Sequence, residues 1–220
     1  MKYYKALLFG SIGSIVETSE IQRKSFNKAF KQYGLDWNWT KLEYQNLLSK
    51  SGGKDRISRY AKKKKIDVNS VYLRNLKTKF FNNYLKKNHL KLRPGVKNLI
   101  SLCKKENIKI AFVSSTSSNN INAILYCLRN SIKKRDFNFI GNAKLVKKYK
   151  PNPDIYLLAL KKLKLKANDC VAIEDSQESL NSARQAKIKC IIFPGKFHSS
   201  KKFTGAYKKV YQLNKNIILR

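Results

Sequence analysis

The sequence predicts an α/β protein in which a doubly wound parallel sheet carries a small helical domain inserted after its first strand. Two observations support this prediction. In the C-terminal part of the chain, short apolar runs alternate with helical stretches, which is the pattern of βαβ units. Between the first apolar run and that part lies a long segment with helical periodicity only. We therefore expect residues 1–16 and 90–220 to form the α/β core and residues 17–89 to form the helical domain.

The first strand and the first inserted helix follow from their apolar positions. Residues 5–9 form a short apolar run, which is typical of a buried parallel strand. A helix is expected to begin at Ser19, where Gln22 completes a capping box, and to end at Gly34. Its apolar face is expected to contain Ile21, Phe26, Ala29, Phe30 and Tyr33.

Two further helices are expected in the insert. Thr40 and Glu43 have the spacing that opens a helix. Its apolar residues are Leu42, Leu47 and Leu48. Gly52 and Gly53 interrupt the chain, and Asp67 can serve as the N-cap residue of a long third helix. The apolar face of that helix is expected to contain Val71, Leu76, Phe80 and Tyr84.

The C-terminal part supplies the other elements of the sheet. Pro94 fits the first turn of a helix. Strands are expected at residues 108–113, 137–140, 170–173 and 190–193. Helices are expected at residues 95–105, 118–129, 154–164 and 176–186.

Composition excludes one class of protein and leaves another open. A chain of 220 residues with 42% hydrophobic residues can bury a core, so it is not a disordered chain. Its 48 Lys and Arg against 13 Asp and Glu give a net charge of +35, which attracts any polyanion without sequence preference. The basic residues recur along the whole chain, and Lys, Asn and Ile are favoured by AT-rich codons. Two explanations of the positive charge therefore stay open: codon bias without any ligand, or a polyanionic partner.

Cysteine, histidine and hydropathy patterns indicate a reduced compartment. The cysteines have no C-x-x-C spacing, and the two histidines lie far apart, so neither a disulfide framework nor a zinc site is expected. The cysteines are Cys103, Cys127, Cys170 and Cys190, and the histidines are His89 and His198. No apolar run is long enough to span a membrane, and no cleavage site follows the apolar N-terminal run. We expect a monomer without membrane association, located in the cytoplasm, or in an organelle stroma if the gene is organellar.

Polar side chains follow the predicted strands at the edge of the sheet where ligands bind. Ser114 and Ser115 precede a helix and suit either a phosphate site or a helix N-cap. Lys150 stands before a Pro-x-Pro turn and can neutralise a phosphoryl group. Glu174 and Asp175 end a strand with two carboxylates, which suits Mg²⁺, although Asp175 or Ser176 could instead serve as the N-cap residue of the next helix.

In this order the segments resemble the haloacid dehalogenase (HAD) superfamily, in the CbbY and β-phosphoglucomutase-like branch. Five stretches carry the resemblance: residues 25–30, 34–37, 51–57, 150–156 and 170–176. The resemblance implies a Rossmann-like core with a helical cap domain, and a Mg²⁺-dependent sugar-phosphate phosphatase or phosphomutase.

The resemblance also implies site residues. Ser114 and Ser115 would bind the phosphoryl group, and Lys150 would neutralise it. Asp175 and Glu174 would serve Mg²⁺. In the cap domain, the residues implied to hold the remote end of a phosphorylated sugar are Gly53, Lys54 and Arg56.

The first motif of the family, Asp-x-Asp-Gly-Thr, is degenerate in this chain. Gly10 stands where the nucleophile is expected, and Ile12 stands where the acid/base is expected. Glycine cannot form an aspartyl-phosphate, and isoleucine cannot transfer a proton. Ser11 and Ser14 do not supply the missing carboxylates, and Mg²⁺ binding is expected to be weak or absent.

We therefore expect a HAD-like protein that is catalytically impaired or inactive. Two alternatives stay open. One is an active sugar-phosphate phosphatase or phosphomutase that uses a repositioned carboxylate. The other is a non-catalytic protein that binds a phosphorylated ligand or a polyanion.

Overall fold

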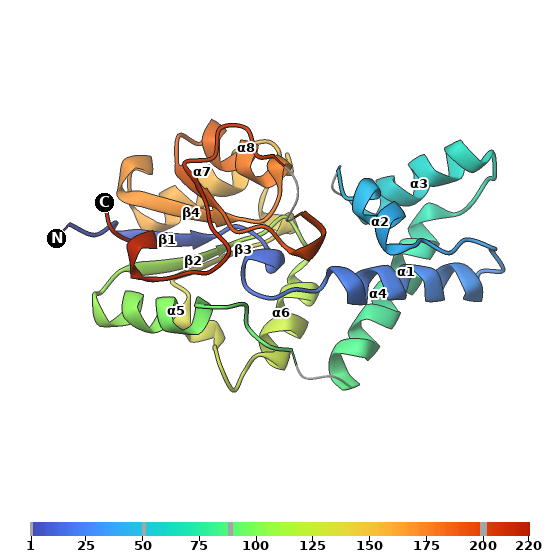
Figure 1. Cartoon of the computed structure of the whole chain (residues 1–220), viewed down its shortest axis with the longest axis horizontal. Helices are drawn as coiled ribbons and strands as arrows, with labels where there is room; N and C mark the ends of the chain where they lie inside the picture. The colour runs from blue at the N-terminus through green and yellow to red at the C-terminus, as the bar shows by residue number, and fades with distance from the viewer. Residues whose placement is uncertain (1, 50–51, 88–89, 199–201) are drawn as a thin grey trace. The chain divides into compact units, whose positions relative to one another are not determined.

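A computed structural model describes residues 2–49, 52–87, 90–198 and 202–220 (Figure 1). The chain divides into two compact units, which are described separately. The α/β unit comprises Met1–Glu17 and Leu90–Arg220, and the helical unit comprises Thr18–His89. Two residues named from the sequence, Ser51 in the 51–57 stretch and His89, lie outside the described residues.

The α/β unit is built on a six-stranded parallel sheet, which confirms the expected fold class. The strand order is β3-β2-β1-β4-β5-β6, and each neighbouring pair is parallel. The strands are β1 (Ala6–Phe9), β2 (Lys109–Val113), β3 (Phe139–Gly141), β4 (Cys170–Glu174), β5 (Lys189–Ile192) and β6 (Lys208–Lys209). Phe9 lies beside Phe112 and Ile173 in the ladder, so β1, β2 and β4 end at the same edge of the sheet.

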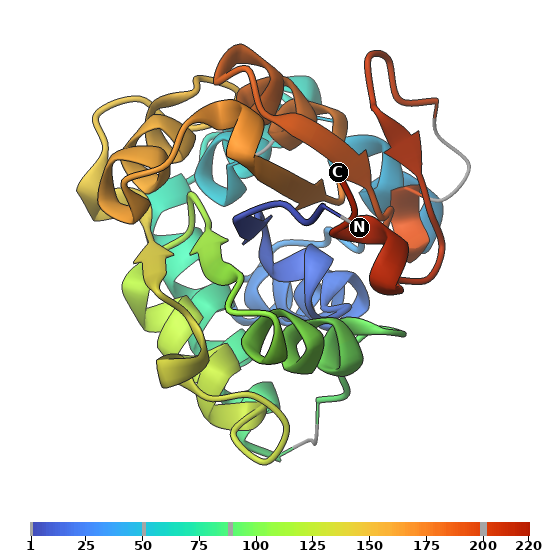
Figure 2. The same ribbon diagram turned by 90° about the vertical axis from the view of Figure 1, so that its left-hand side faces the viewer.

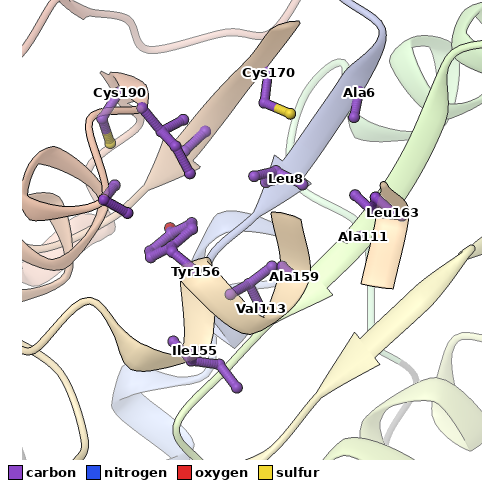
Figure 3. Packing of buried hydrophobic residues seen from close by; sticks show 14 of the residues in the cluster. Ala6, Leu8, Ala111, Val113, Ile155, Tyr156, Ala159, Leu163, Cys170 and Cys190 are labelled. Atoms are coloured by element: carbon purple, nitrogen blue, oxygen red, sulfur yellow. The ribbon is translucent and has the colours of Figure 1, made fainter. Parts of the chain in front are cut away.

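Four helices cover the two faces of this sheet. They are α5 (Val96–Lys105), α6 (Ser118–Cys127), α7 (Asp154–Leu163) and α8 (Gln177–Gln185). Figures 1 and 2 show α5 and α6 on one face and α7 and α8 on the other. Buried side chains of β1, β2 and α7 pack together in the core of this unit (Figure 3). They include Leu8, Val113, Tyr156 and Ala159. A doubly wound sheet is the result.

Two details of this unit differ from the sequence expectations. Pro94 lies in a turn before α5, and the helix starts at Val96 with Gly95 at its N-cap position. Gly95 has a φ of +83°, and a β-carbon there would overlap the backbone of Leu213. The turn therefore needs glycine at residue 95. Because the helix begins only after this turn, Pro94 lies outside the helix. The two-residue strand β6 was not expected, because so short an element has no periodicity.

The helical unit contains α1 (Ser19–Gln32), α2 (Lys41–Leu47), α3 (Gly53–Lys64) and α4 (Ser70–Lys87). Helix α3 was missed, because two consecutive glycines suggested a break; in the structure Gly52 is the N-cap residue and Gly53 opens the helix. Thr40 caps α2 as expected, since its hydroxyl accepts a hydrogen bond from Glu43 N at 3.1 Å. On α2, however, Leu42 is exposed and Tyr44 is the buried residue.

The expected start of α1 at Ser19 is confirmed, whereas the start expected after an Asp67 cap was wrong. The N-cap residue of α1 is Thr18, and Gln22 Nε2 donates to the Thr18 hydroxyl at 3.3 Å. Helix α4 begins at Ser70, where Asn69 Oδ1 accepts from Tyr72 N at 2.9 Å. The buried residues of α4 are Leu73, Leu76, Lys77, Phe81 and Leu85, whereas Val71 and Tyr84 are exposed. A lysine inside the buried stripe hides its periodicity from a hydropathy pattern.

An aromatic cluster forms the core of the helical unit. Phe26 and Phe30 of the expected α1 face are buried against Trp39, with ring centroids 4.8 and 4.7 Å from it. Tyr44 and Tyr60 pack on the same indole.

Among the residues that the structure describes, no helix is long and apolar enough to cross a membrane.

Candidate active site

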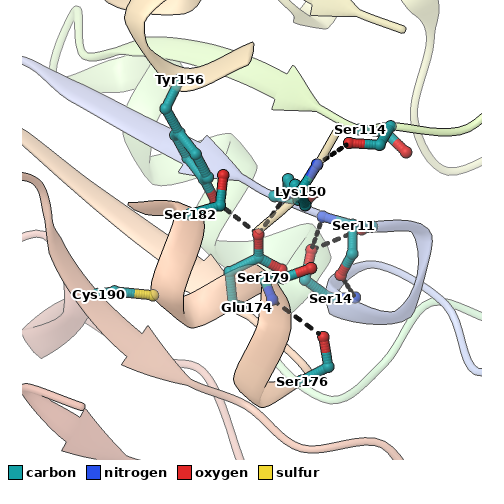
Figure 4. Close-up of polar contacts among 12 residues, drawn as sticks. Ser11, Ser14, Ser114, Lys150, Tyr156, Glu174, Ser176, Ser179, Ser182 and Cys190 are labelled. Atoms are coloured by element: carbon teal, nitrogen blue, oxygen red, sulfur yellow. Dashed lines mark hydrogen bonds and ion pairs between the residues drawn. The ribbon is translucent and has the colours of Figure 1, made fainter. Parts of the chain in front are cut away.

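The candidate site lies where β1, β2 and β4 end. Gly10 follows β1 and continues its ladder, because Gly10 N donates to Ile173 O at 2.9 Å. Ser114 follows β2, and Glu174 ends β4. Lys150 reaches this edge from the turn before α7. The structure therefore brings together four of the residues named from the sequence, of which Figure 4 labels Ser114, Lys150 and Glu174.

Lys150 joins the ends of β1 and β4. Its Nζ lies 2.5 Å from Glu174 Oε1 and 2.5 Å from Gly10 O. Its backbone N donates to the Ser115 hydroxyl at 3.4 Å. Both side chains of the ion pair are buried, with 5% of Lys150 and none of Glu174 exposed. The ammonium is thus hydrogen-bonded to two oxygens of its own chain.

Tyr156 completes the buried cluster. Its hydroxyl donates to Glu174 Oε1 at 2.6 Å, and its ring lies under the Lys150 ammonium. Glu174 Oε2 has no hydrogen-bond partner among the described residues. Burial raises the pKa of Glu174, although Lys150 and the Tyr156 hydroxyl oppose that rise. Burial, reinforced by the Glu174 carboxylate, holds the pKa of Tyr156 well above its ordinary value. Tyr156 belongs to the 150–156 stretch that carries the family resemblance, but nothing in the sequence predicted a role for it.

Gly10 has no room for a side chain. A β-carbon at this position would overlap Glu174 Oε1 and the Tyr156 hydroxyl. Gly13 is similar, because a β-carbon there would overlap Asp175 Oδ2. The two carboxylates of the 174–175 pair thus lie directly over the loop that follows β1. The space that a nucleophile on residue 10 would need is filled.

The other side chains of this loop are engaged locally. Residues 12–14 form a single 3₁₀ turn, and Ile12 is only half-buried. The Ser11 hydroxyl accepts from Ser14 N at 3.1 Å, and the Ser14 hydroxyl donates to Ser11 O at 2.7 Å. Glu17 Oε2 accepts from Lys196 N at 2.8 Å, in the loop after β5. None of these contacts brings a carboxylate of this loop to Gly10.

Helix capping does not account for the predicted site residues. Ser117 is the N-cap residue of α6, and its hydroxyl accepts from Asn120 N at 3.3 Å. Ser114 instead accepts from Thr116 N at 3.2 Å, inside the turn that follows β2. Ser176, not Asp175, is the N-cap residue of α8. Ser114 and Asp175 are therefore available for a role at the strand ends.

Arg93 is a site-supporting residue that the sequence gave no reason to single out. Its guanidinium donates to Gly13 O at 2.6 Å, to Phe193 O at 2.7 Å and to Pro194 O at 2.6 Å. Partial burial lowers its pKa, while Asp175 and Glu17 act in the opposite direction. One cation thus holds the loop after β1 against the loop after β5.

Three residues named from the sequence belong to the helical unit. Gly53 and Lys54 open α3, and Lys54 is exposed. Arg56 is buried, with Nε donating to Leu47 O at 3.0 Å and its guanidinium over the Tyr44 ring.

A second buried cation, Lys77, was not predicted. Its Nζ donates to Gln22 Oε1 at 2.8 Å and lies over the rings of Phe26 and Phe81. Burial, together with the charge of Arg56, lowers the pKa of Lys77 to about 7.

Comparison with known proteins identifies the family. Residues 13–193 match the model of the haloacid dehalogenase-like hydrolases, a span that begins after Gly10 and Ile12. The chain belongs to this family. Protein CbbY of Cereibacter sphaeroides is 35% identical over 205 residues, covering 92% of this chain and 89% of that protein.

Solved structures place the chain in the same branch of the HAD family. CbbY from Rhodobacter sphaeroides in complex with phosphate has a TM-score of 0.86 and 34% identity, covering 94% of this chain and 93% of that one. A mutant of that protein in complex with xylulose-(1,5)bisphosphate matches with the same values. The resemblance to the CbbY and β-phosphoglucomutase-like branch is confirmed.

The residues at the strand ends do not fit a Mg²⁺ ion. Magnesium demands near-octahedral oxygen ligands. Glu174 Oε1 and Gly10 O, two oxygens at the centre of the site, are already bound by Lys150. Within the described ranges, no group of three or more His, Cys, Asp or Glu side chains is arranged to hold a metal. Of the predicted pair, the oxygens that Lys150 does not bind are those of Asp175 and the buried Glu174 Oε2.

Proposed function

We propose that this chain is a non-catalytic member of the HAD family, which keeps the phosphatase fold and has lost phosphoryl transfer. In this proposal the core comprises residues 1–16 and 90–220, and the helical cap domain comprises residues 17–89. Gly53, Lys54 and Arg56 of that cap domain would contact the remote end of a phosphorylated sugar.

The observation that supports the proposal is the filled space beside Gly10. Phosphoryl transfer through an enzyme-bound intermediate needs a nucleophile, and a proton donor for the leaving group. Gly10 has no side chain, and Glu174 and Tyr156 occupy the volume where one would stand. Ile12 has no proton to donate. Removal of the nucleophile alone costs roughly a millionfold in turnover in a well-studied hydrolase.

Steady-state assays test the proposal. The full chain, incubated with Mg²⁺ and a panel of sugar phosphates and bisphosphates, should release no phosphate above background. An active enzyme with a repositioned carboxylate would release phosphate, and Asp175→Ala would abolish that release. Asp67→Ala is the matched control, because Asp67 is exposed and belongs to the helical unit. Turnover that is lost in Asp175→Ala and kept in Asp67→Ala would refute the proposal.

A second candidate function is the binding of a phosphorylated ligand without turnover. The turn of residues 114–116 offers hydroxyl groups at the end of β2, beside the Lys150 backbone. The structures of the relative CbbY contain phosphate and xylulose-(1,5)bisphosphate. Calorimetry with this bisphosphate should show heat with the wild-type chain and a weaker signal with Ser114→Ala. No heat with the wild-type chain would reject this candidate.

A further inference from the structure

The described part of the site contains a cation of its own, the ammonium of Lys150. It contacts a carboxylate oxygen from the end of β4 and a carbonyl oxygen from the end of β1. Both contacts measure 2.5 Å, and the ammonium is shielded from solvent. One positive charge thus bridges the two strand ends that would have to share a metal ion.

We propose that the Lys150 ammonium is the permanent cation of this site and occupies the place of a divalent metal. The inference deepens the proposed function and rests on it, because a site without phosphoryl transfer can dispense with Mg²⁺. A buried carboxylate needs a compensating charge, and Lys150 supplies it to Glu174. A divalent ion brought beside this ammonium would be repelled and would find Glu174 Oε1 already bound.

Gly10 is the residue that permits this arrangement. Glu174 Oε1 and the Tyr156 hydroxyl approach the backbone of residue 10 so closely that any β-carbon would overlap them. Tyr156 then fixes the carboxylate by donating to the same oxygen at 2.6 Å. The absence of a side chain at residue 10 and the closed ion pair are therefore two parts of one structural change.

Removal of the lysine should reopen the site to a metal. In Lys150→Met, Glu174 Oε1 has lost its ammonium partner, and Glu174 Oε2 has no partner among the described residues. Carboxylate oxygens without a compensating cation are ligands that Mg²⁺ prefers. Loss of the internal cation should therefore create a Mg²⁺ response that the wild-type chain lacks.

Thermal unfolding in EDTA and in increasing MgCl₂ tests this inference. The Tm of the wild-type chain should be the same in both. Lys150→Met should unfold at a lower temperature in EDTA, and its Tm should rise by about 5–10 °C when Mg²⁺ reaches about 100 times the dissociation constant. Lys150→Met combined with Glu174→Gln should show no rise. Lys109→Met is the matched control, because Lys109 Nζ donates to the Leu163 carbonyl at 2.9 Å, and this variant should not respond.

Two outcomes would overturn the inference. One is a Tm of the wild-type chain that rises with Mg²⁺ and loses this response in Asp175→Ala. The other is a folded Lys150→Met variant that does not respond to Mg²⁺. If Lys150→Met does not fold, calorimetry of the wild-type chain with MgCl₂ decides: no binding supports the inference, and binding that requires Asp175 refutes it. Phosphate release plays no part in these measurements, so the proposed function can fail separately.

Discussion

Glu174 lies where a side chain on Gly10 would have to stand. The carboxylate enters that volume because it is held by Lys150 and by the Tyr156 hydroxyl, both of which are buried with it. A strand end that lacks its nucleophile could have remained an open cavity. Here the neighbouring side chains close it with an ion pair.

Gly10→Ala should destabilise the α/β unit. The added methyl group must displace Glu174 or Tyr156, and overpacking costs about 1–3 kcal/mol, with a further 1–3 kcal/mol or so where a buried hydrogen bond breaks. We expect the free energy of unfolding in urea to fall by about 2–4 kcal/mol. Gly53→Ala is the control: the nearest atom to its new β-carbon would be Phe26 Cζ at 3.6 Å, and alanine favours a helix. Equal stability of Gly10→Ala and the wild-type chain would show that the space is not filled.

Tyr156→Phe should weaken the same cluster without creating a cavity. A hydrogen bond to a charged group contributes about 1.5–3 kcal/mol, and the substitution leaves Glu174 with Lys150 as its remaining side-chain partner. We expect a loss of this size in urea unfolding. Tyr126→Phe, at an exposed tyrosine, should change stability by less than about 0.5 kcal/mol. A loss no larger than that of the control would contradict the assignment.

Lys77 should make stability depend on pH. Burial lowers the pKa of Lys77 from 10.5 to about 7 in the folded chain, so the unfolded chain binds more protons between these pH values. Stability should therefore rise with pH across this window, by on the order of a few kcal/mol, and level off below it.

Urea unfolding at a series of pH values checks the Lys77 prediction. Titrating groups that are common to the variants cancel when Lys77→Met is compared with the wild-type chain. The rise should disappear in Lys77→Met and persist in Lys79→Met, because Lys79 is exposed. A wild-type chain and a Lys77→Met variant with parallel profiles would rule out a lowered pKa of Lys77.

Arg93→Met should loosen the loop that follows β1. Three backbone carbonyls lose their donor, and each hydrogen bond to a charged group contributes about 1.5–3 kcal/mol before water replaces it. We expect a net loss of about 2–4 kcal/mol and faster amide exchange at Ser14, whose backbone N donates to Ser11 within this loop. Arg135→Met, at an exposed arginine, should have neither effect. Unchanged exchange at Ser14 would show that Arg93 does not hold this loop.

The sheet was predictable because buried parallel strands appear as apolar runs. β1, β2, β4 and β5 each occur within a residue or so of the expected position, and the topology places their ends together. Helix starts and buried positions were not predictable where the residue type is unusual for that place. Gly52 and Gly53 suggest a break, yet Gly52 is the N-cap residue of α3 and Gly53 is its first residue. Lys77 interrupts an apolar stripe although its own side chain is buried.

The candidate site was predictable in its location and not in its contacts. The residues after the strands identify the edge where Ser114, Lys150 and Glu174 lie. The pairing of Lys150 with Glu174 depends on side-chain rotamers and on the missing β-carbon of Gly10, which no spacing encodes. Arg93 has three backbone partners, and a sequence pattern carries no information about carbonyl groups.

A single-turnover experiment tests the central claim most directly. The full chain, in excess over xylulose-1,5-bisphosphate and with Mg²⁺ present, should release no inorganic phosphate and should carry no covalent phosphoryl group by mass spectrometry. Phosphate release that requires Mg²⁺ and disappears in Asp175→Ala would show that the site still transfers phosphoryl groups, and would contradict this account.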